Sequence, residues 1–173
     1  MVDGKRRLVL IAHNVRSAHN VGSLLRTADG LCVEMVYLTG YTPYPESPQD
    51  DRPPHIRGKV SAAISKTALG AEKSVNWNYY ADIQDCLDRL EKRGFTIAAL
   101  EQTPVSRDIT DFSPPSKVAL VAGNEVEGLD EEILKNLKIH LRIPMLGAKE
   151  SFNVAIAASI ALYHLRYLDK NTP

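Results

Sequence analysis

Residues 8–38 read LVLIAHNVRSAHNVGSLLRTADGLCVEMVYL, and they determine the fold class that we expect for this chain. The apolar run Leu8–Ala12 predicts a buried strand, and Val33–Leu38 predicts another. Between them, after Asn20, apolar residues recur at the spacing of one helix face. These residues are Val21, Leu24, Leu25 and Ala28. A strand, a helix and a strand in this order open a parallel α/β sheet.

The same alternation continues along the 173 residues. Later strands are predicted at Phe95–Leu100, Val118–Ala122 and Ile139–Ile143. Helices are predicted at Asp82–Arg93, where Gly94 marks the end, and at Phe152–Leu168. We therefore expect an α/β fold with a mostly parallel sheet and helices on both faces. The length fits a single domain over residues 1–173.

A proline-rich segment, Gly40–Pro54, interrupts this alternation. Such a segment sustains neither a helix nor a central strand, so it predicts an extended surface loop. Loops of this length are usually functional or mobile. This composition is compatible both with a loop that covers the substrate and with a surface loop that has no function.

Charge is balanced overall but segregated along the chain. The 21 basic and 21 acidic residues cancel, although contacts with phosphates normally dominate the affinity of proteins for nucleic acids. Most of the charged residues among residues 1–30 are basic, whereas residues 124–132 contain five acidic residues and no basic one. This distribution is compatible with a local basic face, which an oligomer would enlarge.

Cys32 and Cys86 lie far apart in the sequence and form no cysteine–histidine cluster. We expect buried free thiols, no disulfide and no metal site. The longest apolar stretches fall short of the ~20 residues that a membrane span needs, and the N-terminus lacks the apolar core of a signal peptide. We therefore expect a soluble cytoplasmic protein.

Three segments rich in Gly, Asn, Ser, Arg and Glu each adjoin an apolar run. They are Asn14–Ala28, Val121–Gly128 and Ile143–Val154. Because open parallel sheets bind ligands at the carboxyl ends of their strands, the three segments predict one composite site. No G-x-G-x-x-G follows a strand and no G-x-x-x-x-G-K-[ST] occurs, which argues against a dinucleotide site or a P-loop.

In order and spacing, these segments resemble the three motifs of the SpoU/TrmH family, which belongs to the SPOUT superfamily. The resemblance extends from about Leu8 to Leu168. It implies an S-adenosylmethionine-dependent methyltransferase that acts on ribose 2′-hydroxyls of tRNA or rRNA. It also implies a deep trefoil knot in the C-terminal part and a homodimer with the knot at its interface.

The resemblance further assigns roles to individual residues. The implied catalytic residues are Arg26, Asn20, Glu125, Ser151 and Asn153. The implied cofactor contacts are Leu100, Gly123, Ile143, Met145, Ser151 and Phe152. The implied RNA contacts are Arg16 and Arg26. Phe152 stands where the family usually has leucine, which keeps the position apolar.

Several of these residues also have simpler interpretations. An arginine on a helix surface is ordinarily a solvated cation, Gly123 fits a plain tight turn, and Ser151 is a natural N-cap for the last helix. If Arg26 is catalytic, its guanidinium stays protonated, since its pKa is above about 12. We therefore expect Arg26 to bind phosphate and to stabilise the forming alkoxide. Glu125 could orient either Arg26 or Asn20.

His13 directly precedes the first segment and His19 lies within it, but isolated histidines at loop positions are usually surface residues. Two other functions stay open at this stage. One is an RNA-binding or regulatory protein that holds the cofactor without turning it over. The other is a small-molecule methyltransferase.

Overall fold

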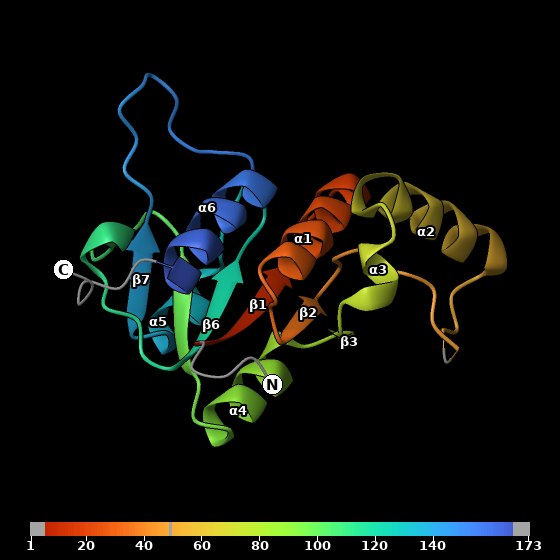
Figure 1. The fold of residues 1–173 in the computed structure, drawn as a ribbon, viewed down its shortest axis with the longest axis horizontal. Coiled ribbons are helices and arrows are strands. Elements are labelled where there is room, and N and C mark those ends of the chain that lie inside the picture. Colours follow the sequence, from red (N-terminus) through yellow and green to blue (C-terminus); the bar gives the residue numbers. More distant parts are fainter. Residues whose placement is uncertain (1–5, 49, 168–173) are drawn as a thin grey trace.

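One parallel sheet with helices on both sides organises the protein (Figure 1). A computed structural model describes residues 6–48 and 50–167. The strands are β1 (Arg7–His13), β2 (Met35–Thr39), β3 (Trp77–Tyr80), β4 (Thr96–Leu100), β5 (Arg107–Asp108), β6 (Lys117–Ala122) and β7 (Ile139–Arg142). Their order across the sheet is β3-β2-β1-β6-β4-β7-β5, and neighbouring strands pair in parallel. The predicted α/β class with a parallel sheet is therefore confirmed.

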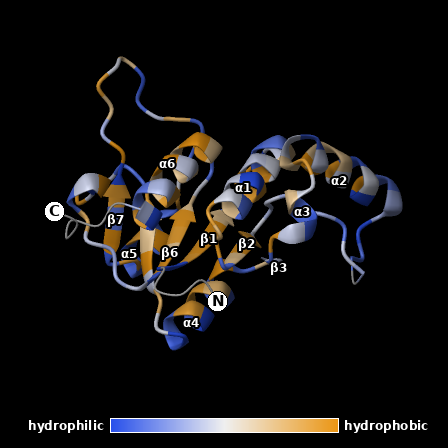
Figure 2. Ribbon diagram, viewed as in Figure 1, coloured by the Kyte–Doolittle hydropathy of each residue, from blue (hydrophilic) through white to orange (hydrophobic). Residues whose placement is uncertain are grey.

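The helices divide between the two faces of this sheet. They are α1 (Ala18–Gly30), α2 (Pro54–Ala68), α3 (Ala71–Ser74), α4 (Ile83–Lys92), the 3₁₀ helix η1 (Ile109–Asp111), α5 (Glu131–Asn136) and α6 (Val154–Tyr167). Alternate residues of β1 serve two cores, with Leu8 and Leu10 facing α1 and α6 and with Val9 and Ile11 facing α4. Figure 2 shows the apolar strands enclosed between these layers.

Helix α2 packs mainly against α1, on the side of α1 away from α6 (Figure 1). Gly22 makes this close crossing feasible. A Cβ at Gly22 would lie 2.2 Å from the carbonyl oxygen of Ile64 and 2.2 Å from the hydroxyl oxygen of Thr67. The crossing therefore depends on the absence of a side chain at this position.

The sequence patterns do not predict α2, α3, α5, β3 or β5. Helix α2 begins at Pro54, inside the segment that we expected to be a loop, because proline is well tolerated in the first turn of a helix. The described residues between Gly40 and Pro53 do form a loop. This loop packs on the protein, since the rings of Tyr44 and Tyr79 stack with their centroids 4.2 Å apart. The guanidinium of Arg52 lies 3.6 Å from the Tyr44 ring centroid.

Two local expectations need correction. The last helix begins at Val154 rather than at Phe152, and its expected end, Leu168, lies outside the described residues. Cys86 is buried as expected, but Cys32 is exposed, because it lies in the turn after α1 with a φ of 50°. None of the helices within residues 6–48 and 50–167 combines the length and the apolar character that crossing a bilayer requires.

Candidate active site

A cavity of about 180 Å³ lies at the carboxyl ends of β4, β6 and β7. Five of the implied cofactor contacts line it, namely Leu100, Gly123, Ile143, Ser151 and Phe152. The sixth, Met145, is half-buried and does not line the cavity. Met145 belongs to the segment 143–153, which extends away from the sheet (Figure 1). The topology thus brings together residues from three distant segments, as the parallel-sheet rule predicts.

Gly123 fixes the shape of the loop on one side of the cavity. A Cβ at Gly123 would lie 2.8 Å from the carbonyl carbon and 2.8 Å from the carbonyl oxygen of Gly128. Asn124 and Gly128 exchange two backbone hydrogen bonds of 3.1 Å each. Gly123 therefore serves a tight turn and also lines the cavity, while its contact with a cofactor stays a prediction.

Glu101 is a cavity residue that the motifs did not indicate. One of its carboxylate oxygens accepts a 3.0 Å hydrogen bond from the backbone N–H of Leu129, and the other accepts one of 3.0 Å from Gln102. Glu101 thereby ties the end of β4 to the loop after β6. The position of Glu101 directly after a predicted strand could have indicated that it belongs to the site, because the carboxyl ends of parallel strands gather at one edge of the sheet.

Three of the implied catalytic residues form a chain of hydrogen bonds beside the cavity. The side-chain amide of Asn20 donates to Glu125 over 2.7 Å, and the amide of Asn153 donates to Asn20 over 3.2 Å. The backbone N–H of Arg16 donates to the second carboxylate oxygen of Glu125 over 3.1 Å. Glu125 thus orients Asn20, one of the two partners that we considered.

The environment of Glu125 keeps it ionised. Burial raises the pKa of this carboxyl, but several hydrogen bonds, among them those from Arg16 and Asn20, together outweigh burial and leave the pKa below its usual value. An ionised carboxylate only accepts hydrogen bonds. Glu125 is therefore suited to hold Asn20 in one orientation.

Asn153, rather than Ser151, caps the last helix. The side-chain oxygen of Asn153 accepts hydrogen bonds from the backbone N–H groups of Ala155 over 3.0 Å and Ile156 over 3.4 Å. The interpretation of Ser151 as the cap is wrong, because the helix begins two residues later than expected. Asn153 consequently has two roles, since its amide group also contacts Asn20.

Arg26 lies apart from this cavity within the chain. It is exposed near the middle of α1 and lines a separate hollow between α1 and α2, together with Lys66. Helix α1 starts at the N-cap Ser17, whose hydroxyl accepts from the backbone N–H of Asn20, and this start fixes the positions of Asn20 and Arg26. Arg16 is exposed just before this cap.

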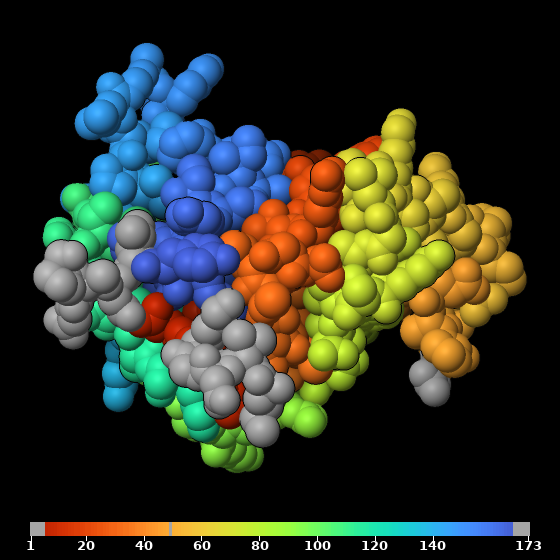
Figure 3. Space-filling view, viewed as in Figure 1, coloured from red at the N-terminus to blue at the C-terminus, as the bar shows by residue number. Residues whose placement is uncertain are grey.

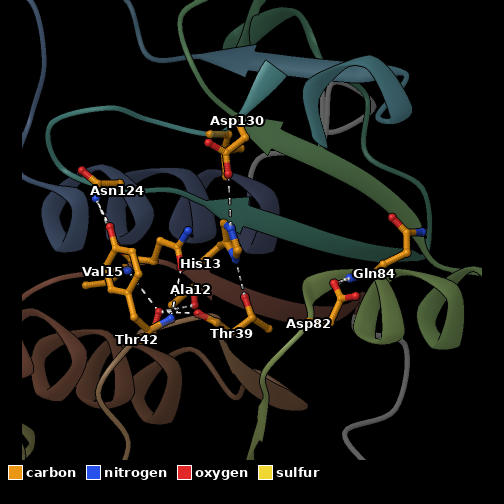
Figure 4. Close-up of polar contacts among 12 residues, drawn as sticks. Ala12, His13, Val15, Thr39, Thr42, Asp82, Gln84, Asn124 and Asp130 are labelled. Carbon is orange, nitrogen blue, oxygen red and sulfur yellow. Dashed lines mark hydrogen bonds and ion pairs between the residues drawn. The ribbon is translucent and has the colours of Figure 1, made fainter. Parts of the chain in front are cut away.

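His13 is buried, contrary to the expectation for a loop histidine, because it is the last residue of β1. Figure 4 shows its ring between Thr39 and Asp130. Its Nδ1 lies 2.9 Å from the Thr39 hydroxyl oxygen, and its Nε2 lies 3.9 Å from a carboxylate oxygen of Asp130. Burial lowers the pKa of His13, and the nearby charges of Asp130 and Asp82 oppose this only in part. His19, in contrast, is exposed.

Asn124 bridges the loops that surround the site. Its side-chain oxygen accepts from the backbone N–H groups of Val126 over 2.7 Å and Glu127 over 3.0 Å, and its amide donates to the hydroxyl of Tyr41. In the described part of the chain, no three His, Cys, Asp or Glu side chains group closely enough to bind a metal ion.

The comparisons with known proteins agree with this arrangement. The model of the SpoU rRNA Methylase family matches residues 7–163. The chain belongs to the SpoU rRNA Methylase family. The matched residues include every strand of the sheet and every residue of the hydrogen-bonded chain from Asn20 to Asn153.

Individual relatives are identical to this SpoU-family chain at about a quarter to a third of the aligned residues. A Staphylococcus epidermidis protein assigned to the TrmH family of tRNA/rRNA methyltransferases is 27% identical over 91% of the chain. A tRNA (guanosine(18)-2′-O)-methyltransferase of Borreliella burgdorferi is 32% identical over 56% of the chain. The chain spans 57% and 44%, respectively, of the lengths of these two relatives.

Solved structures show the same fold. A structure of an AdoMet-bound rRNA methyltransferase from Sinorhizobium meliloti superimposes with a TM-score of 0.78. It is 23% identical, and the match covers 95% of this chain and 57% of that one.

Proposed function

We propose that this SpoU-family chain transfers a methyl group from S-adenosylmethionine to a ribose 2′-hydroxyl of tRNA or rRNA. The observation that carries the proposal is the hydrogen-bonded chain of Asn20, Glu125 and Asn153 beside a cavity lined by two of the three motifs. The Borreliella burgdorferi relative supports the choice of a 2′-hydroxyl, because its name specifies this reaction. The tRNA and rRNA alternatives both stay within the proposal.

The cavity fits the proposed cofactor. Leu100, Ile143 and the half-exposed ring of Phe152 supply an apolar lining for a purine base. Glu101 and Ser151 add polar groups along the same wall. Gly123 lines the cavity as well, and its lack of a Cβ keeps the turn to Gly128 tight. When bound, S-adenosylmethionine supplies an electrophilic methyl group on a sulfonium.

The residues of the chain then act on the ribose. The ribose oxygen would take the methyl group of the bound cofactor, which would leave as a neutral thioether, and the hydroxyl proton would pass to water. Negative charge develops on the ribose oxygen during the transfer, and a nearby cation stabilises this charge while the cation itself stays protonated. We assign this role to Arg26. Asn20, held by Glu125 and Asn153, positions polar groups of the substrate.

A homodimer would complete the site. Exposed apolar side chains follow one face of α6 at the spacing of helical turns, namely Ile156, Ile160, Tyr163 and Tyr167. Helix α6 lies beside α1, where the hydroxyls of Thr27 and Ser159 are 2.7 Å apart, and Figure 3 shows both helices on one face. A second copy seated on α6 would therefore border Arg26. In such a dimer, Arg26 of one copy serves the cavity of the other.

We also propose the threaded C-terminal knot and a cytoplasmic location. Helix α6 packs against η1 as well as against β1, β4 and β6. The last helix therefore contacts both the sheet and the connection 101–116, which contains η1. These contacts support a threaded segment. The cytoplasmic location is proposed because tRNA and ribosomes, the proposed substrates, are abundant there.

The experiment is a transfer assay with radiolabelled S-adenosylmethionine and total cellular RNA, followed by nuclease digestion and identification of 2′-O-methylated nucleosides. We expect labelled 2′-O-methylnucleosides with the native chain and none with Arg26→Ala. Cofactor binding without any transfer would favour the regulatory alternative. Labelled product that survives removal of all RNA would favour a small-molecule substrate.

Dimer formation is tested separately by light scattering and by mixing variants. Ile160→Glu places a charge in the apolar face of α6 and should yield monomers. Arg26→Ala and Asn153→Ala should each be inactive alone, and a mixture should regain part of the activity if the two residues act across the interface. A mixture without activity would contradict this arrangement.

A further inference from the structure

A second hollow lies between α1 and α2 and shares no lining residue with the cavity. Ser23, Arg26 and Thr27 line it from α1, and Lys66, Thr67 and Leu69 line it from the end of α2. Arg26 and Lys66 are exposed, and none of these six described residues is acidic. The hydroxyls of Ser23 and Thr67 already donate to the backbone carbonyl of His19, so the two cations, Arg26 and Lys66, are the donors suited to an anion.

The two helices hold these cations on neighbouring surfaces. The Thr67 hydroxyl donates to the backbone carbonyl of His19 over 2.8 Å, next to the close approach at Gly22. In the part of the chain that the structure describes, neither Arg26 nor Lys66 makes a hydrogen bond or an ion pair. Like charges on adjacent helices repel, so the proximity of Arg26 and Lys66 does not stabilise the fold. An external anion would remove this repulsion.

Other basic residues of α2 separate into two kinds. Arg57 supports the preceding loop, because it donates to the carbonyl of Asp50 over 2.9 Å and lies 3.5 Å from Glu46. Lys59 instead lies on the same exposed helix face as Lys66, seven residues earlier. Lys59 and Lys66 thus form a basic stripe that leads along α2 to Arg26.

We propose that this hollow binds the phosphate backbone of the substrate RNA, with Lys66 as a phosphate-binding residue beside Arg26. The inference rests on the proposed function and adds a binding surface and a residue to it. Lys66 grips a phosphate as a point charge, and Lys59 continues the contact along the strand. Because phosphates repeat along an extended RNA strand, cations that follow one line on a helix can contact more than one of them.

The test measures binding of bulk tRNA and bulk rRNA at several salt concentrations for Lys66→Ala, Lys66→Arg and a matched control. The control is Lys92→Ala, which removes an exposed helical lysine at the end of α4, on the opposite face of the sheet. Loss of one phosphate contact should weaken binding about fourfold at ~0.15 M salt and reduce the slope of log K against log salt by about 0.7. The KM for RNA should rise with little change in kcat.

The outcomes separate the inference from the function that it rests on. We expect Lys66→Ala to show both changes, Lys66→Arg to restore most of the affinity, and Lys92→Ala to resemble the native chain. Equal affinities for S-adenosylhomocysteine in all variants would confirm that the cavity is intact. If the native chain binds and methylates RNA but Lys66→Ala has the same salt slope and KM, the inference is overturned alone. If the native chain neither binds nor methylates RNA, the proposed function falls, and the inference falls with it.

Discussion

Gly22→Ala tests whether the close crossing of α1 and α2 depends on a missing side chain. The added Cβ would meet the carbonyl oxygen of Ile64 and the hydroxyl oxygen of Thr67, each at 2.2 Å, and the backbone nitrogen of Ala68 at 2.9 Å. Two of these three atoms belong to the backbone of α2. Because backbone atoms cannot rotate away, the clash is relieved only if the two helices move apart.

The magnitude follows from two opposing effects. Overpacking a buried contact costs typically about 1–3 kcal/mol, and backbone contacts place this substitution at the upper end, about 3 kcal/mol. Alanine regains about 1 kcal/mol relative to glycine within a helix. The net loss of unfolding free energy is therefore about 2 kcal/mol. For a domain of this size, such a loss lowers the Tm by about 4–8 °C.

The control is Gly30→Ala, at the last residue of the same helix. A Cβ there meets no atom within 4 Å, so alanine should only add helix propensity. Thermal and urea unfolding, followed by circular dichroism, measure both variants. We expect Gly22→Ala to melt below the native chain and Gly30→Ala at or slightly above it. A Gly22→Ala variant that is as stable as Gly30→Ala would refute the role of Gly22.

Three further predictions concern stability and reactivity. The pKa of His13 is lowered in the folded state, so the unfolded state binds the proton more readily. The stability that neutral His13 contributes is therefore complete above about pH 6.5 and is lost below it. In urea titrations at pH 7.5 and 5.5, His13→Asn should lose less unfolding free energy on acidification than the native chain. An unchanged pH dependence would argue against this. Asn153→Ala removes the α6 cap and should cost about 1 kcal/mol, whereas Ser151→Ala should be neutral; equal Tm values for the two would contradict the assignment. In the native chain, Ellman's reagent should label Cys32 quickly and Cys86 only after denaturation, because burial raises the pKa of the Cys86 thiol to about 12; rapid labelling of both would be inconsistent with the fold.

Sequence periodicity alone predicts the elements that pack directly on the sheet. The apolar spacing of Val21, Leu24 and Leu25 indicates α1, because each of these residues faces the core. Helix α2 gives no such pattern. It buries only Ile64 and Ala68, since it packs on another helix through small residues and backbone. Strand β3 is similarly difficult, because its residues are half-buried or exposed at an edge of the sheet.

For the site, the sequence motifs indicated which residues belong to it. The tertiary structure decided which of them lie beside the cavity and which lie in the hollow between α1 and α2. Asn20, Glu125 and Asn153 do meet, because the starts of α1 and α6 and the loop after β6 converge at a single edge of the sheet. The separation of Arg26 from the cavity, and its proximity to Lys66, depend on the angle at which α1 crosses its neighbours. Such an angle depends on contacts between residues remote in sequence, and local patterns do not encode it.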